Sequence, residues 1–130
     1  MNILSKKYLI SYFLLILFAF SGDLKAQKNW GTYSTVITEQ GYAGLKFRYK
    51  VFIRTVIEDS DATASIWVQI NRKNGRGFAG NLNNLNIKNG DWKEYVLEGT
   101  IDDDYSQIIL GLLGRYDGKF YFDDISFEVE

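Results

Sequence analysis

The chain has 130 residues and a formal net charge of −1, with 15 Lys and Arg side chains against 16 Asp and Glu. This length accommodates one domain, the near-neutral balance argues against a nucleic-acid partner, and a 46% apolar content excludes wholesale disorder. The chain contains neither Cys nor His, so it cannot form disulfides, a Ser-His-Asp or Cys-His catalytic site, or a His-zinc centre.

The first 26 residues have the layout of a secretory signal peptide. Lys6 and Lys7 precede the apolar run 8–20, and the small residue Ala26 follows a short polar stretch. The run is shorter than the roughly 18–20 apolar residues that a membrane-spanning helix needs. We therefore predict cleavage after Ala26 and export to the periplasm, the cell surface or the medium. The mature chain, residues 27–130, is predicted to be a single domain without a membrane span.

Period-two alternation predicts β-strands from residue 32 onwards. Residues 32–38 form a short β-rich run that Gly and polar residues end. Apolar and polar side chains alternate along residues 45–57, which is typical of a strand with one buried and one solvated face. Residues 64–71 show the same pattern, after a turn cluster of acidic side chains. These runs indicate antiparallel β-structure.

The second half of the mature chain begins with an irregular segment. Residues 72–91 are rich in Gly and Asn, and we predict a loop of about 20 residues, a length that is often functional. Further strands are predicted at 92–101, at 107–113, and at 119–129; the continuous apolar run of the second indicates burial on both faces. Because no segment repeats apolar residues at the spacing of an amphipathic helix, the predicted fold is an all-β antiparallel β-sandwich.

Several segments together resemble the jelly-roll modules of the carbohydrate-binding, galactose-binding-like superfamily. Residues 118–127 are similar to the closing strand of those modules, where an Asp-Asp pair precedes an aliphatic residue, and 92–101 resemble their W-x-x-Y … G-x-I strand. The order of motifs from Gly41 to Trp92 is similar to that of the small N-terminal modules of secreted bacterial hydrolases, among them erythromycin-esterase-type proteins. The resemblance covers roughly residues 32–129 and implies a jelly roll.

The resemblance implies a module that binds an extracellular ligand. Carbohydrate is the leading prediction for that ligand, with a cell-surface protein as the alternative partner. The sequence ends at Glu130 with no catalytic segment after the jelly roll, so we expect no enzymatic activity. A structural or protein-interaction module, or a detached accessory domain of a hydrolase, is the alternative interpretation.

The predicted ligand site lies on an outward sheet face. Alternation turns Trp67 and its polar neighbours outward, and we expect Phe52 and Arg54 of the preceding strand on the same face. An aromatic plane beside amides and a guanidinium suits a sugar, which offers an apolar ring face and hydroxyl groups. The alternative is that the 72–91 segment simply covers this face. The predicted ligand contacts are Trp67, Arg54, Gln69, Asn71, Phe78 and Asn81.

The pair Asp123 and Asp124 suggests a structural cation. Adjacent strand residues point to opposite faces, so one of the two carboxylates should turn inward and need a partner. In the resembling modules such an Asp often serves a structural Ca²⁺, and Glu39 with backbone carbonyls would complete the oxygen ligands here. A hydrogen bond to the backbone or an ion pair is the alternative role, and no cofactor is predicted to be required.

Overall fold

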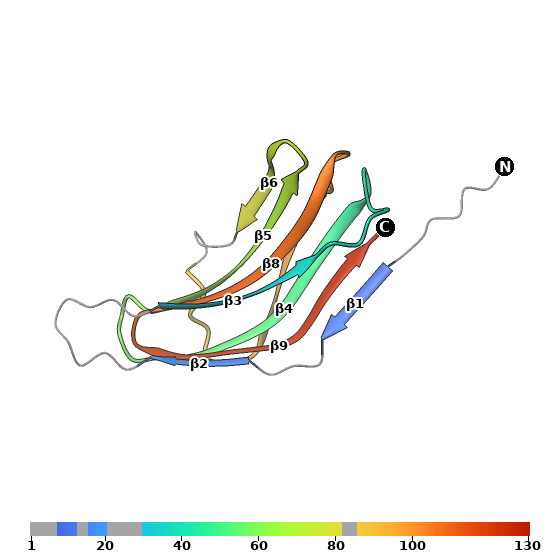
Figure 1. Cartoon of the computed structure of the whole chain (residues 1–130). Helices are drawn as coiled ribbons and strands as arrows, with labels where there is room; N and C mark the ends of the chain where they lie inside the picture. Colours follow the sequence, from blue (N-terminus) through green and yellow to red (C-terminus); the bar gives the residue numbers. More distant parts are fainter. Residues whose placement is uncertain (1–7, 13–15, 21–29, 82–85) are drawn as a thin grey trace.

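The computed structural model describes residues 8–12, 16–20, 30–81 and 86–130. Over these residues the chain forms nine β-strands in two antiparallel sheets that pack against each other (Figure 1). This confirms the predicted all-β sandwich. In the described ranges there is no helix long and apolar enough to cross a membrane.

The four-stranded sheet has the order β3-β8-β5-β6. The five-stranded sheet has the order β9-β4-β7, with both β1 and β2 along the outer edge of β9. The strands of the first sheet are β3 (Trp30–Ile37), β8 (Tyr105–Arg115), β5 (Thr63–Arg72) and β6 (Gly75–Asn81). Those of the second are β1 (Tyr8–Tyr12), β2 (Ile16–Phe20), β9 (Gly118–Val129), β4 (Lys46–Ile57) and β7 (Lys93–Thr100).

Strands β1 and β2 belong to the segment that the sequence predicts to be a signal peptide. β1 pairs with β9 from Tyr8 opposite Val129 onwards, and β2 pairs with β9 up to Phe20 opposite Gly118. In the full-length chain β9 therefore has a neighbouring strand on both sides. The predicted cleavage position after Ala26 lies outside the described residues, so cleavage stays a prediction.

The alternation that predicts the strands also builds the core. On β4, Phe47, Tyr49, Val51, Ile53 and Thr55 face inward and are buried, as predicted. Burying each large apolar side chain contributes roughly 1.5–3 kcal/mol, which lets a sandwich without disulfides hold together. The largest fully buried side chains of the described residues come from β4, β5, β8, β9 and two connections; they are Tyr49, Phe120, Phe122, Phe127, Ile53, Ile66, Ile70, Ile87, Ile101, Ile108, Leu110 and Leu112.

The prediction of one irregular loop over 72–91 is wrong for residues 75–81. These residues form β6, which pairs with β5 as a hairpin. Its glycines hide the strand signal, yet the structure requires two of them. Gly75 has φ +107°, and a Cβ at Gly77 would come 2.5 Å from the backbone oxygen of Ile70. The hairpin thus depends on residues that a propensity pattern assigns to loops.

The apolar run in β8 is also less buried than predicted. Ile108, Leu110 and Leu112 face the core, whereas Ile109 and Leu113 are half-buried on the outward side. The outward side of β8 is therefore a partly open apolar surface. Figure 1 shows both sheets bending in the same sense, with β5, β6 and β8 on the inner side of the bend and β4 and β9 on the outer side.

Candidate functional site

An indole ring lies flat on the outward face of the four-stranded sheet. Trp67 of β5 is paired with Gly111 of β8, and a Cβ at Gly111 would come 1.9 Å from Trp67 Cε2 and 2.3 Å from Cζ2 and Nε1. Only glycine leaves room for the ring at that position. One face of the indole therefore rests on the β8 backbone, and the half-buried ring offers its other face outward.

A ladder of amides continues from the ring along the same face. Gln69 Nε2 donates to Asn71 Oδ1 at 2.7 Å, and Asn71 Nδ2 donates to Gln107 Oε1 at 3.1 Å. The two bonds fix the orientation of all three amides. Among the described residues, neither Gln69 Oε1 nor Gln107 Nε2 has a hydrogen-bond partner, so the ladder presents an acceptor at one end and a donor at the other.

Strand β3 extends this face beyond β8. Ser34 is paired with Gly111, and Val36 is paired with Ile109, so both continue the rows that start at Trp67 and Gln69. Val36 is 50% exposed. We call the surface formed by Ser34, Val36, Trp67, Gln69, Asn71, Gln107, Ile109 and Gly111 the Trp67 face. It combines an aromatic plane, an apolar strip and ordered amides.

The structure brings some of the predicted ligand contacts together and separates others. Trp67, Gln69 and Asn71 share one face, as predicted. The expectation that Phe52 and Arg54 lie beside them is wrong, because β4 pairs with β7 and β9 and β5 pairs with β8 and β6. The outward faces of these consecutive strands are thus on opposite sides of the sandwich.

The two contacts expected from the long segment also differ from the prediction. Phe78 points toward the core and packs edge-to-face against Phe47, with ring centroids 5.4 Å apart. It therefore does not belong to the Trp67 face. The backbone of Asn81 pairs with Trp67, which gives Asn81 a register position beside the ring, but its side chain lies outside the described structure.

A second aromatic cluster lies on the outward face of the five-stranded sheet. Arg54 is paired with Tyr121, and its guanidinium carbon lies 4.8 Å from the centre of the Tyr121 ring. Trp92 contacts the same tyrosine edge-to-face at 6.5 Å between centroids and is 43% exposed. Sequence reasoning missed Trp92 and Tyr121 as surface residues. The alternation of buried Phe120 and Phe122 around Tyr121 is the signal that could have found the tyrosine.

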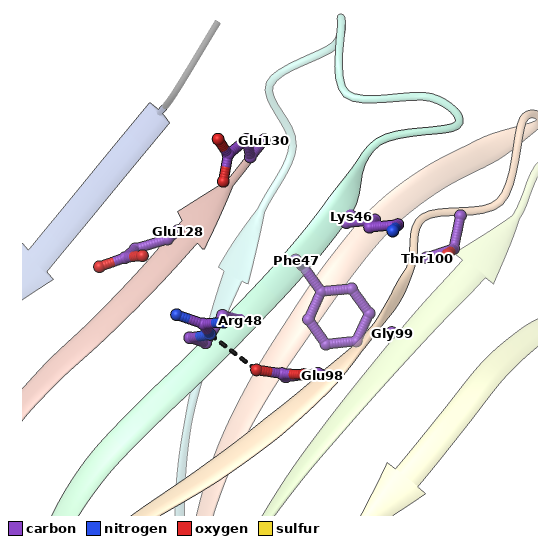
Figure 2. Close-up of a pocket in the computed structure, with 8 residues that line it drawn as sticks. All are labelled: Lys46, Phe47, Arg48, Glu98, Gly99, Thr100, Glu128 and Glu130. Atoms are coloured by element: carbon purple, nitrogen blue, oxygen red, sulfur yellow. Dashed lines mark hydrogen bonds and ion pairs between the residues drawn. The ribbon is translucent and has the colours of Figure 1, made fainter. Parts of the chain in front are cut away.

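Ion pairs occupy the other end of that outward face. Arg48 and Glu98 extend side by side from β4 and β7 and are joined at 2.7 Å (Figure 2). Lys50 pairs with Glu128 at 3.4 Å. An open depression of about 380 Å³ surrounds this end, lined by Lys46, Phe47, Arg48, Glu98, Gly99, Thr100, Glu128 and Glu130. The lining carries both signs of charge, and the Arg48–Glu98 pair neutralises one cation and one anion within it.

A carboxylate clasp ties the β5–β6 hairpin to the turn before β8. Asp102 accepts hydrogen bonds from Arg72 Nε at 2.8 Å and from the Phe78 backbone N–H at 3.2 Å. Partial burial by itself would raise the pKa of Asp102, but these two hydrogen bonds and the arginine charge outweigh it and lower that pKa. Through Asp102, the turn before β8 therefore clamps the hairpin.

The predicted calcium ligands do not come together. Asp123 and Asp124 both point outward, which contradicts the expectation that one turns inward. The reason is a β-bulge: the register shifts between Lys50 and Phe52, and Asp124 has φ +49°. Glu39 follows β3 in the other sheet. Within the described residues, no group of three or more Asp, Glu, His or Cys side chains could hold a metal ion, so these residues do not fit a calcium site.

Comparisons with known proteins support the fold. No protein-family model matches the chain, and no curated protein is significantly similar in sequence. A solved structure described as "Family 16 Carbohydrate Binding Module-2" has a TM-score of 0.57 at 15% identity, over 75% of this chain and 70% of its own. Another, described as "CBM4 structure and function", has a TM-score of 0.54 at 15% identity, over 76% of this chain and 61% of its own.

At this level of identity the likeness establishes the architecture. The chain has the jelly-roll β-sandwich fold of carbohydrate-binding modules, as the sequence resemblance implies. The narrower resemblance to the N-terminal modules of erythromycin-esterase-type proteins stays a prediction.

Proposed function

We propose that this protein is a non-catalytic carbohydrate-binding module that holds a glycan on the Trp67 face. The observation that carries the proposal is the indole lying flat over Gly111 beside the amide ladder. The fold shared with two solved carbohydrate-binding modules supports it. The position of β5 and β8 on the inner side of the bend also supports it, because an extended ligand can run along such a surface (Figure 1).

Binding would proceed by stacking and hydrogen bonding. The apolar face of a pyranose stacks on the outward face of Trp67, while its hydroxyls donate to Gln69 Oε1 and accept from Gln107 Nε2. Because Gly111 and the hydrogen bonds between the amides already fix these groups, little side-chain freedom is lost on binding. The polar side-chain groups of this face are three amides, the Ser34 hydroxyl and the indole N–H, whereas glycoside hydrolysis uses a pair of carboxylic acids. The face therefore suits binding and not hydrolysis.

Titration of the full-length protein with soluble polysaccharides tests the proposal. Intrinsic tryptophan fluorescence should shift in a saturable way with at least one glycan, and Trp67→Ala should weaken that affinity at least tenfold. Tyr33→Ala is the matched control, since Tyr33 is 44% exposed on β3 but, by strand alternation, does not share the face of Ser34. If folded Trp67→Ala binds as many glycan molecules as the wild type with the same affinity, the Trp67 site is refuted. The absence of any glycan binding would favour a protein partner for the face.

We further infer that the protein is exported. The basic start, the apolar run 8–20 and the small residue Ala26 support this inference. Polysaccharides and cell-surface glycans lie outside the cytoplasm, so export would bring the module to its ligand. The pairing of β1 and β2 with β9 means that cleavage would open the outer edge of β9.

A further inference from the structure

The second aromatic cluster is built across three strands of the five-stranded sheet. Arg54 of β4 lies between Tyr121 of β9 and the start of β7, and Trp92 is the residue before Lys93, which pairs with Ile53. Trp92, Arg54 and Tyr121 therefore form one row on the outward face. The guanidinium is held over the tyrosine ring, and none of its N–H groups has a hydrogen-bond acceptor among the described residues.

Asn89 holds the segment that carries Trp92 against β4. Its backbone oxygen accepts from the Thr55 N–H at 2.9 Å and from Thr55 Oγ1 at 3.1 Å. Its side-chain nitrogen donates to Ile53 O and Asp91 O, both at 2.7 Å, and its side-chain oxygen accepts from Tyr95 Oη. With its hydrogen-bonding groups engaged, Asn89 is a positioning residue that fixes the backbone three residues before the exposed indole.

The next row of the face supplies acceptors. Phe52 is paired with Glu94 on one side and with Asp123 on the other. Successive rows on one face of a sheet are about 7 Å apart, so the carboxylates lie within reach of a sugar that contacts the first row. We call Phe52, Arg54, Trp92, Glu94, Tyr121 and Asp123 the Trp92 face. It differs from the Trp67 face by combining guanidinium donors with carboxylate acceptors.

We propose that the Trp92 face is a second glycan-binding site, specific for neutral saccharides. This inference rests on the proposed carbohydrate-binding function. Trp92 supplies the stacking plane, Arg54 donates to sugar oxygens, and Glu94 and Asp123 accept from sugar hydroxyls. An anionic glycan is disfavoured, because the three carboxylates of Glu94, Asp123 and the neighbouring Asp124 outnumber the two nearby cations, Arg54 and Lys119. The ion pairs Arg48–Glu98, drawn in Figure 2, and Lys50–Glu128 lie farther along the same outward sheet face.

Two sites on opposite sides of the sandwich make the module bivalent. The Trp67 and Trp92 faces belong to different sheets and point away from each other, with the core between them. One straight glycan segment cannot contact both faces, so a single protein molecule connects two glycan chains. On a surface with many chains, the second contact becomes effectively intramolecular and increases the residence time of the protein.

The stoichiometry of binding tests this inference. Calorimetric titration of the full-length protein with short neutral oligosaccharides of glucan, mannan and xylan should give two sites per chain with the matching sugar. Trp67→Ala and Trp92→Ala should each leave one site, and the double variant none. The wild type should also cross-link and precipitate the matching soluble polysaccharide, whereas each single variant binds it without precipitation. An oligogalacturonate should not compete at the site that remains in Trp67→Ala.

Each outcome separates the second site from the first. One site in the wild type, unchanged in Trp92→Ala and lost in Trp67→Ala, would overturn the second site and leave the proposed function intact. One site lost only in Trp92→Ala would instead overturn the Trp67 face and bivalency. Binding of the anionic oligosaccharide would overturn the specificity. Arg54→Gln is a second test that keeps the indole: it should weaken the Trp92 site at least tenfold, and wild-type affinity at that site would refute the role of the guanidinium.

Discussion

The close contact between Trp67 and Gly111 gives a sharp test of how the proposed stacking platform is built. In Gly111→Ala, the new Cβ would lie 1.9 Å from Trp67 Cε2, while ordinary contacts begin at 3.4 Å. The indole or the β8 backbone must therefore move by about 1.5 Å, the difference between those two distances. Overpacking of this kind costs about 2 kcal/mol, which for a domain of this size lowers Tm by roughly 10 °C.

The affinity should fall even though Trp67 itself is present. Once the ring leaves the sheet, the stacking plane and the amide ladder no longer face one sugar, so we expect the affinity for glycan at the Trp67 site to drop at least tenfold at 25 °C, where the variant is still folded. Thermal unfolding and calorimetric titration measure the two effects. Gly90→Ala is the matched control, since a Cβ there meets nothing within 4 Å. Wild-type Tm and affinity in Gly111→Ala would refute the proposed packing of the ring.

Three further predictions concern the Asp102 clasp, the buried Tyr49 and the predicted signal peptide. The lowered pKa of Asp102 means that its contribution to stability is present above the ordinary value of 3.8 and is lost as the pH falls through the folded-state pKa. Asp102→Asn should therefore lower Tm at pH 7 and approach the wild type only as the pH falls through the lowered pKa of Asp102; a Tm difference independent of pH would contradict this. Tyr49→Phe removes a buried hydrogen bond to Gly111 O at 3.2 Å and should cost about 1 kcal/mol in denaturant unfolding. Burial raises the pKa of Tyr49 well above its ordinary value of 10. The absorbance titration of the tyrosines in Tyr49→Phe should therefore match that of the wild type up to pH 11. If the variant instead lacks a tyrosine that titrates near pH 10 in the wild type, the burial of Tyr49 is refuted. The intact mass of the protein collected outside the cell should correspond to residues 27–130, and a full-length mass would refute cleavage after Ala26.

Strand positions could be predicted from the sequence because period-two alternation is a local property. The burial of alternate side chains on β4 and β5 follows directly from the pattern. Strand β6 could not be predicted in this way. Its Gly77 is needed because the backbone of β5 comes very close to it, and a pattern of apolar and polar residues does not show such an approach. The orientation of Asp124 was missed for a related reason: one bulge residue with φ +49° reverses the phase of the remaining strand, and Ile125 takes the inward position.

The candidate sites depend on a level of organisation that alternation does not contain. Alternation shows which residues share a face of one strand, but the pairing of strands determines which faces lie together. β4 and β5 follow each other in the chain and yet belong to different sheets, so Arg54 and Trp67, one merged site in the sequence interpretation, are on opposite sides of the molecule. The same separation brings Arg54 to Trp92 and Tyr121. The pairing that excludes Arg54 from the first site thus assembles the second, and for this reason the number of glycan chains bound per protein is the quantity on which the two interpretations differ.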